Sequence, residues 1–251
     1  MTTIGILGTG GLAALMVRGL QGSGFRILLS PRNASVSARL AADYGCEVAA
    51  SNQAVVDGVQ GVFVSLPAAT GVGELARLTF RPGQPVLSAM AGTGLTRLQS
   101  VIGPARAAVS MMPGYANALG VGPSILYPDD PFWRPFLAAT GPVIAFEDEA
   151  TFTTAASFGA FSGASFGLMS HIIAWFEDQG LPADTARMLV AATLRGNAEV
   201  LLRESRSLPE IAREVITPGG ISELLVATLA ERDAFSAWDE ALTRVRRRIG
   251  G

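Results

Sequence analysis

Short apolar runs of strand length alternate with segments of helical spacing between Ile4 and Phe146. The segments are bounded by Gly, Pro, Ser or Asn, which interrupt regular structure. This alternation is typical of βαβ units with a parallel sheet. The predicted strands are Ile4–Leu7, Phe25–Leu29, Val62–Leu66, Val86–Ala89, Ala107–Met111 and Val143–Phe146, and the predicted helices between them are Leu12–Gln21, Ser35–Tyr44, Gly73–Leu78 and Leu95–Val101.

The pattern changes after the acidic run Glu147–Glu149, because strand-like runs disappear and helical spacing continues to the end of the chain. The uncharged stretch Ala150–Phe176 predicts one long helix, and the next helix is expected from Pro182 to about Glu204. Two shorter helices are expected after Pro218–Gly220. We therefore expect an α/β domain over residues 1–148 and an all-α domain over residues 149–251.

The stretch Ala150–Phe176 is long enough to cross a bilayer, which takes about 20 apolar residues. Its many serines, threonines and glycines suit close helix packing inside a protein better, so we expect no membrane span. A helical domain with this much apolar surface cannot bury it alone. The domain is therefore predicted to form a homodimer or a higher homo-oligomer.

Composition excludes several classes of function. Hydrophobic residues make up 49% of the 251-residue chain and charged residues only 16%, so a large core is expected and overall disorder is excluded. The net charge of -2 lacks the basic excess that nucleic-acid binding requires. All 19 basic residues are Arg, which excludes a Schiff-base lysine and a P-loop lysine.

Cys46 and His171 each stand alone, because the sequence contains one cysteine and one histidine. This excludes an intramolecular disulfide and a metal centre built from cysteines or several histidines, and we expect no metal. A single cysteine suits a reducing compartment. The first residues lead directly into an apolar strand without the features of a signal peptide, so a cytoplasmic protein is expected.

A glycine-rich turn joins the first predicted strand to the first predicted helix. Its sequence, Gly8-Thr9-Gly10-Gly11-Leu12-Ala13, matches the G-x-G-x-x-G/A pattern of dinucleotide-binding sites. Gly8 allows the tight turn, Gly10 lets a pyrophosphate approach the backbone, and Ala13 keeps the helix close to the sheet. The helix N-terminus adds amides and the positive end of its dipole. We predict a Rossmann-type dinucleotide-binding domain, with an ordinary strand–helix turn as the alternative.

The end of the second predicted strand indicates which nicotinamide cofactor binds. An NAD site carries Asp or Glu there for the ribose 2′-hydroxyl, whereas this chain has Ser30-Pro31-Arg32-Asn33. Ser30 and Asn33 can hydrogen-bond a 2′-phosphate, and Arg32 can also neutralise it. The prediction is therefore NADP, entering the reaction as NADPH. The alternative for Arg32 is a solvated turn residue.

Nearly the whole chain resembles the pyrroline-5-carboxylate reductase family. Beyond the glycine turn and the second-strand end, Asn52 matches a family Asn, Met90-Ala91-Gly92 is similar to its Ala-Ala-Gly turn, and Met112-Pro113-Gly114 is similar to its Met-Pro-Asn. Ser162-Gly163 opens the predicted long helix as in the family. This run and Val215–Ser222 are the most specific matches, and Val215–Ser222 is similar to the family's Ser/Thr-Pro-Gly-Gly-x-Thr signature.

The resemblance implies two groups of site residues. The cofactor contacts would be Gly8, Thr9, Gly10, Gly11, Leu12, Ala13, Ser30, Arg32, Asn33, Asn52, Leu66, Pro67, Ala91, Gly92, Met112 and Pro113, and the substrate contacts Thr217, Gly219, Gly220 and Ser222. Amides beside the two glycines can hold a substrate carboxylate, and the Ser222 hydroxyl can hydrogen-bond the ring nitrogen of an imine. Without the family, the same segment is equally well a Pro-Gly-Gly turn with Ser222 as a helix N-cap.

Three departures from the family pattern lie where the family holds nicotinamide and substrate. Its Lys-Pro is Leu66-Pro67 here, its Asn after Met-Pro is Gly114, and its Ser-Gly-Ser-Gly-Pro-Ala-Tyr run is Ser162–Leu168. His171 shares a helical face with neighbouring apolar residues. We expect it to be a packed, hydrogen-bonded residue, with protonation of a substrate as the alternative.

Together these interpretations predict an NADPH-dependent reductase that transfers a hydride to a small cyclic imine carboxylate. The resemblance implies pyrroline-5-carboxylate as the substrate and proline as the product. A protonated imine is already electrophilic, so a site without an obvious catalytic acid suits this chemistry, and positioning supplies most of the catalysis. Two alternatives stay open: an NADPH-dependent reductase of another imine or of a carbonyl compound, and a non-catalytic NADP-binding protein.

Overall fold

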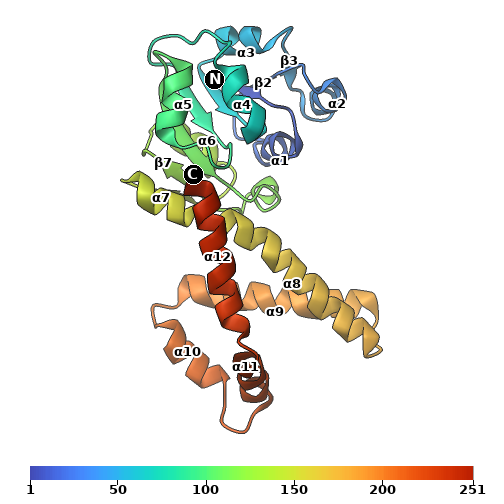
Figure 1. The fold of residues 1–251 in the computed structure, drawn as a ribbon. Helices are drawn as coiled ribbons and strands as arrows, with labels where there is room; N and C mark the ends of the chain where they lie inside the picture. The colour runs from blue at the N-terminus through green and yellow to red at the C-terminus, as the bar shows by residue number, and fades with distance from the viewer. Residues whose placement is uncertain (251) are drawn as a thin grey trace. The chain divides into compact units, whose positions relative to one another are not determined.

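The computed structural model describes Met1–Gly250, and its first part is an eight-stranded sheet with helices on both faces (Figure 1). The strands are β1 (Thr3–Leu7), β2 (Arg26–Leu29), β3 (Glu47–Val48), β4 (Gly61–Val64), β5 (Pro85–Ser88), β6 (Arg106–Met111), β7 (Ser124–Tyr127) and β8 (Val143–Ala145). They lie in the order β3-β2-β1-β4-β5-β6-β7-β8. The order reverses between β1 and β4, which is where ligands bind in doubly wound sheets.

The helices between the strands are α1 (Gly11–Gly19), α2 (Ala34–Tyr44), α3 (Asn52–Gly58), α4 (Ala68–Leu75), α5 (Leu95–Ile102) and α6 (Trp133–Ala138), with a 3₁₀ turn η1 (Asn117–Leu119). Successive strand residues point to opposite faces. Ile6 and Phe63 therefore join the core under α1, α2 and α6, while Leu7 and Val62 join the core under α3, α4 and α5. Burial on both faces explains why these strands are continuous apolar runs.

The predicted α/β class and its parallel sheet are confirmed for β1 to β6, whose pairings are all parallel. The prediction is wrong at β7, which pairs antiparallel with β6 and has no counterpart among the predicted strands. The connection from β6 to β7 contains only the short turn η1, whereas a parallel return usually runs through a crossover helix. β3, α3 and α6 were also not predicted, and α4 begins at Ala68 rather than Gly73 because Pro67 is its N-cap.

The rest of the described chain is helical, as predicted. The helices are α7 (Glu149–Ala155), α8 (Phe158–Asp178), α9 (Ala183–Arg203), α10 (Leu208–Val215), α11 (Ile221–Glu231) and α12 (Ala234–Gly250). The single helix expected over Ala150–Phe176 is wrong, because the chain forms α7 and α8 instead. The start of α8 packs tightly on β6, since a Cβ at Gly159 would lie 2.9 Å from Sδ of Met111.

The chain forms two compact units. The first contains Met1–Ala160 together with the chain from Val245 onward, and the second contains Phe161–Arg244. α7 belongs to the first unit because Phe152 and Ala156 are buried in the core of the sheet. This division differs from the predicted domain boundary at residue 148, which stays a prediction. None of the helices within Met1–Gly250 combines the length and the apolar character that crossing a bilayer requires.

Candidate cofactor and substrate sites

The glycine turn between β1 and α1 has the backbone geometry that a dinucleotide needs. Gly8 has a φ of 95°, and a Cβ there would lie 2.7 Å from the Ser65 carbonyl oxygen, so only glycine fits. A Cβ at Gly10 or Gly11 would have no neighbour within 4 Å, which leaves space beside this backbone. The first turn of α1 has neither a side-chain cap nor an acidic residue. The residues present therefore fit a pyrophosphate at this helix N-terminus.

Hydroxyl groups, most of them buried, hold the glycine turn in place. The Gly8 N–H donates to Oγ of Ser30 at 3.1 Å, and the Thr9 hydroxyl donates to the Ser30 carbonyl oxygen at 3.2 Å. The Ser37 hydroxyl donates to the same carbonyl oxygen at 2.9 Å, and the Ser65 hydroxyl donates to the Gly8 carbonyl oxygen at 2.8 Å. Ser30 is fully buried, so its placement corrects the expected contact with a 2′-phosphate. It supports the turn instead.

Arg32 and Asn33 lie in the loop between β2 and α2. Arg32 is exposed, and its Nη1 lies 3.3 Å from Oε1 of Glu74 on α4. Oδ1 of Asn33 caps α2 by accepting a hydrogen bond from the Val36 N–H at 3.4 Å. Sequence reasoning missed Glu74, because nothing local connects a helix residue of α4 with the loop after β2. The guanidinium group of Arg32 is therefore accessible, and the carboxylate of Glu74 already lies beside it.

The other cofactor candidates follow the carboxyl ends of strands. Asn52 is the first residue of α3, while Leu66-Pro67, Ala91-Gly92 and Met112-Pro113 follow β4, β5 and β6. Carboxyl ends of parallel strands meet at one edge of a sheet, so these residues share the edge that carries the glycine turn. Leu66 and Met112 are buried, which limits them to backbone and apolar contacts.

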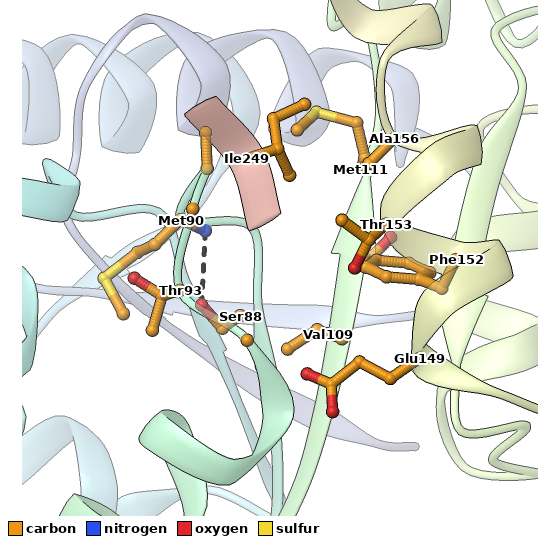
Figure 2. A pocket seen from close by; sticks show the side chains of 14 residues that line it. Ser88, Met90, Thr93, Val109, Met111, Glu149, Phe152, Thr153, Ala156 and Ile249 are labelled. Carbon is orange, nitrogen blue, oxygen red and sulfur yellow. Dashed lines mark hydrogen bonds between the residues drawn. The ribbon is translucent and has the colours of Figure 1, made fainter. Parts of the chain in front are cut away.

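A cavity of about 30 Å³ lies at the same edge (Figure 2). Its walls come from Ser88 at the end of β5, Met90 after β5, Met111 of β6, Phe152 of α7 and Ile249 of α12. The Met90 N–H donates to Oγ of Ser88 at 3.2 Å. The volume suits about one water molecule and is far too small for a nicotinamide ring. The cavity is therefore a gap behind the turn after β5, not a substrate pocket.

Glu149 also lines this cavity, and its carboxylate has a structural role. Oε1 accepts a hydrogen bond at 2.8 Å from the N–H of Leu95, the first residue of α5. The N-cap of α5 is Gly94, which has no side chain to cap the helix. Glu149 of α7 thus supplies the missing cap from a distant element, and its negative charge suits the helix N-terminus. In the sequence it is only part of an acidic run.

Gly114 stands where the family pattern has Asn, and the structure explains why glycine is tolerated. Its φ is 84°, in the left-handed region that Gly and Asn adopt most readily. The backbone turn is therefore kept while the amide side chain is lost. The fully buried Asn117 holds this loop: Oδ1 accepts from the Gly114 N–H at 2.9 Å, and Nδ2 donates to the Gly122 carbonyl oxygen at 2.8 Å.

The Pro-Gly-Gly segment lies in the second unit, between α10 and α11. The Gly219 N–H donates to Oε2 of Glu223 at 2.7 Å, and the Gly220 N–H donates to the Thr217 carbonyl oxygen at 3.0 Å. Both glycine amides thus have internal partners, which corrects the expectation that they are open to a substrate carboxylate. The N-cap of α11 is Gly220, so the alternative role of Ser222 as N-cap is also wrong.

Ser222 lies in the first turn of α11 and is half-buried. Its hydroxyl makes no hydrogen bond to another side chain or to the backbone within Met1–Gly250, which leaves it available to a ligand. A Cβ at Gly220 would lie 2.6 Å from Oγ1 of Thr217, so glycine is required for this turn. His171 is exposed on α8 in the single chain, and the packed, hydrogen-bonded role expected for it stays a prediction.

Comparisons with known proteins cover both units. The family model for pyrroline-5-carboxylate reductase dimerisation matches residues 149–250, and the model described as NADP oxidoreductase coenzyme F420-dependent matches residues 3–92. The pyrroline-5-carboxylate reductase of Pseudomonas aeruginosa is 27% identical over 259 residues, which cover 98% of this chain and 94% of that protein.

Solved structures share the fold from end to end. The 1-pyrroline-5-carboxylate reductase of Streptococcus pyogenes has a TM-score of 0.87 and 20% identity, covering 99% of this chain and 98% of that one. The pyrroline carboxylate reductase of Plasmodium falciparum, solved with NADP bound, has a TM-score of 0.86 and 13% identity. The match covers 99% of this chain and 97% of that one.

A glycine turn on a Rossmann-type sheet followed by a helical unit defines an oxidoreductase that uses a nicotinamide dinucleotide. Within that class, the C-terminal part matches the dimerisation domain of pyrroline-5-carboxylate reductases, and the chain is similar to such a reductase over almost its whole length. Its helical part is of the family's dimerisation type, which indicates an oligomer.

Proposed function

We propose that the protein is an NADPH-dependent reductase that converts pyrroline-5-carboxylate to proline. The observation that carries this proposal is the similarity to the Pseudomonas aeruginosa enzyme over 98% of this chain and 94% of that protein. The glycine turn supports it independently, because Gly8 is sterically required and Gly10 has open space beside it.

The first unit would hold the cofactor. Amides of the glycine turn and of the first turn of α1 bind the pyrophosphate, and the buried Ser30 keeps that turn in place. Arg32 binds the 2′-phosphate through charge-assisted hydrogen bonds. Asn52 and the turns after β4, β5 and β6, at Leu66-Pro67, Ala91-Gly92 and Met112-Pro113, line the rest of the same edge.

The second unit would hold the substrate. Because the Gly219 and Gly220 amides have partners, the substrate carboxylate is assigned to the amides of Ile221 and Ser222 in the first turn of α11. The Ser222 hydroxyl is assigned to the ring nitrogen, and Thr217 keeps the turn that presents it. When bound, NADPH supplies a hydride that adds to the carbon of the protonated imine, giving a secondary amine and NADP⁺. The chain's own contribution is orientation.

The test is NADPH oxidation with pyrroline-5-carboxylate, combined with measured proline formation. We expect Ser222→Ala to lower kcat/KM for the imine and to leave NADPH binding unchanged, and Arg32→Ala to raise the KM for NADPH more than that for NADH. Ser205→Ala is the control, because Ser205 is an exposed loop serine of the same unit. Binding of NADPH without turnover of this imine would refute the proposed substrate.

A panel of other cyclic imines and carbonyl compounds then separates the remaining alternatives. Turnover of one of them identifies a reductase with another substrate, whereas binding without any turnover identifies a non-catalytic NADP-binding protein.

We further propose a homodimer or higher homo-oligomer formed through the helical unit, because several large apolar side chains of α9 and α11 are exposed in the single chain. They include Met188, Leu201, Leu202, Leu224 and Leu225. Light scattering coupled to size-exclusion chromatography measures the subunit number, and a monomer would contradict this assignment. Location in the reducing cytoplasm remains a prediction from the single cysteine.

A further inference from the structure

The carboxylate of Glu74 lies beside the arginine that the sequence assigns to a cofactor phosphate. Nη1 of Arg32 and Oε1 of Glu74 are 3.3 Å apart, and Nη1 of Arg77 lies 3.6 Å from the same oxygen. The Glu74 side chain is 24% exposed, against 58% for Arg32. The carboxylate is thus the more enclosed partner of an otherwise accessible pair.

The pair formed by Arg32 and Glu74 lies where this fold binds a dinucleotide. Arg32 follows β2 and Glu74 lies on α4, which follows β4, while β1 with its glycine turn lies between β2 and β4 in the sheet. The pair therefore connects the two sides of the crevice in which a dinucleotide lies in this fold. The end of β2 is where such folds recognise the ribose 2′ position.

A carboxylate at this place favours one type of nucleotide over the other. An acidic residue accepts a hydrogen bond from a ribose 2′-hydroxyl and repels a 2′-phosphate. The strand end Ser30–Asn33 contains no acidic residue, but the fold supplies one from α4. The ribose 2′ position is thus expected to meet an arginine and a carboxylate together.

We propose that Glu74 determines how strongly the protein discriminates between NADP and NAD, by opposing the 2′-phosphate that Arg32 attracts. This inference rests on the proposed cofactor site, and it adds a residue that limits the preference for NADP. Arg77 neutralises part of the charge of Glu74, so the opposition is moderate. The Glu74 carboxylate and the 2′-phosphate are like charges that would share the Arg32 guanidinium near the surface. We expect their repulsion to change the affinity for a 2′-phosphorylated nucleotide about three- to tenfold.

The test is calorimetric binding of two cofactor fragments, adenosine 2′,5′-bisphosphate and 5′-AMP, which differ only at the ribose 2′ position. We expect Glu74→Gln to tighten binding of the bisphosphate about three- to tenfold and not to tighten binding of 5′-AMP. Raising the salt concentration should shrink the difference. Thermal unfolding of the variant checks that it folds, and Glu74→Ala serves as a second variant that also removes the charge.

The matched control is Glu47→Gln, which breaks a different exposed pair of the same unit, that of Glu47 with Arg26. It should leave both affinities unchanged. Weaker binding of the bisphosphate to Glu74→Gln would mean that Glu74 positions Arg32 for the phosphate, and this would overturn the inference while leaving the proposed cofactor intact. An equal change for both fragments would overturn it as well. If neither fragment binds the unaltered protein, the proposed cofactor site fails together with it.

Discussion

Replacing Gly10 by alanine distinguishes what the folded chain requires at this position from what cofactor binding requires. Gly10 has φ -106° and ψ -162°, which any residue adopts, and a Cβ there would meet no atom within 4 Å. The free protein should therefore tolerate Gly10→Ala. A bound pyrophosphate should not, because the new methyl group would occupy the side from which it approaches the backbone.

The substitution is expected to raise the stability of the free protein and to weaken its binding of NADPH. An alanine at a compatible position stabilises a protein by about 0.4–1 kcal/mol through the unfolded state, which raises the Tm of a chain of this size by roughly 1–4 °C. Loss of the close backbone approach should weaken NADPH binding at least about tenfold, or about 1.4 kcal/mol. The variant should thus be at least as stable as the unaltered protein without ligand and less stable than it with NADPH.

Thermal unfolding with and without NADPH, supported by calorimetry, measures both quantities. Gly8→Ala provides the contrast, because its Cβ would lie 2.7 Å from the Ser65 carbonyl oxygen at a φ of 95°. That variant should lose stability even without cofactor, by about 1–3 kcal/mol. If Gly10→Ala binds NADPH normally, the assignment of this backbone to the pyrophosphate is refuted. If the variant unfolds at a lower temperature without ligand, the claim that the free protein tolerates a Cβ at this position is refuted.

Further predictions concern three buried residues of the first unit, Asn117, Asp130 and Cys46. Asn117→Ala should cost about 2–4 kcal/mol in urea unfolding, because two buried backbone groups lose their partner; full stability would contradict this. Asp130→Ala should cost about 1–3 kcal/mol, since the nearly buried carboxylate accepts two hydrogen bonds from Arg106, and Asp130→Asn should cost less. Burial raises the pKa of Cys46 from 9.0 to about 11, so iodoacetamide should alkylate it about a hundredfold more slowly at pH 8 than an exposed thiol. The stabilisation that accompanies this raised pKa should be complete below about pH 9 and be lost as the pH rises through about 11.

The sequence predicts features whose cause is local. Gly8 was recognised because the tight turn before a helix gives it a positive φ that favours glycine, and Gly10 because a bound pyrophosphate needs room beside the backbone there. Contacts between distant elements leave no such trace. The hydrogen bond of Glu149 to Leu95 joins α7 to α5, and in the sequence Glu149 is indistinguishable from its acidic neighbours.

The same reasoning explains the errors in the predicted elements. β7 is a short strand between Pro123 and Pro128, and its direction depends on the connection from β6 rather than on its own residues. Ser30 was interpreted from its place at a strand end, where exposure is usual, but Ser37 and the glycine turn enclose it. Burial of a polar residue by segments distant in the sequence cannot be read from local spacing.

The last turn of α12 affects how the protein should be handled in the laboratory. Ile249 lines the cavity behind the turn after β5, and a Cβ at Gly92 would lie 3.7 Å from the Arg248 carbonyl oxygen. An affinity tag attached directly to this end of α12 would therefore lie near Gly92, which is assigned to the cofactor. Met1 lies at the opposite edge of the sheet, before the first residue of β1. Tags, fluorophores and surface tethers are better attached there, where they leave NADPH binding undisturbed.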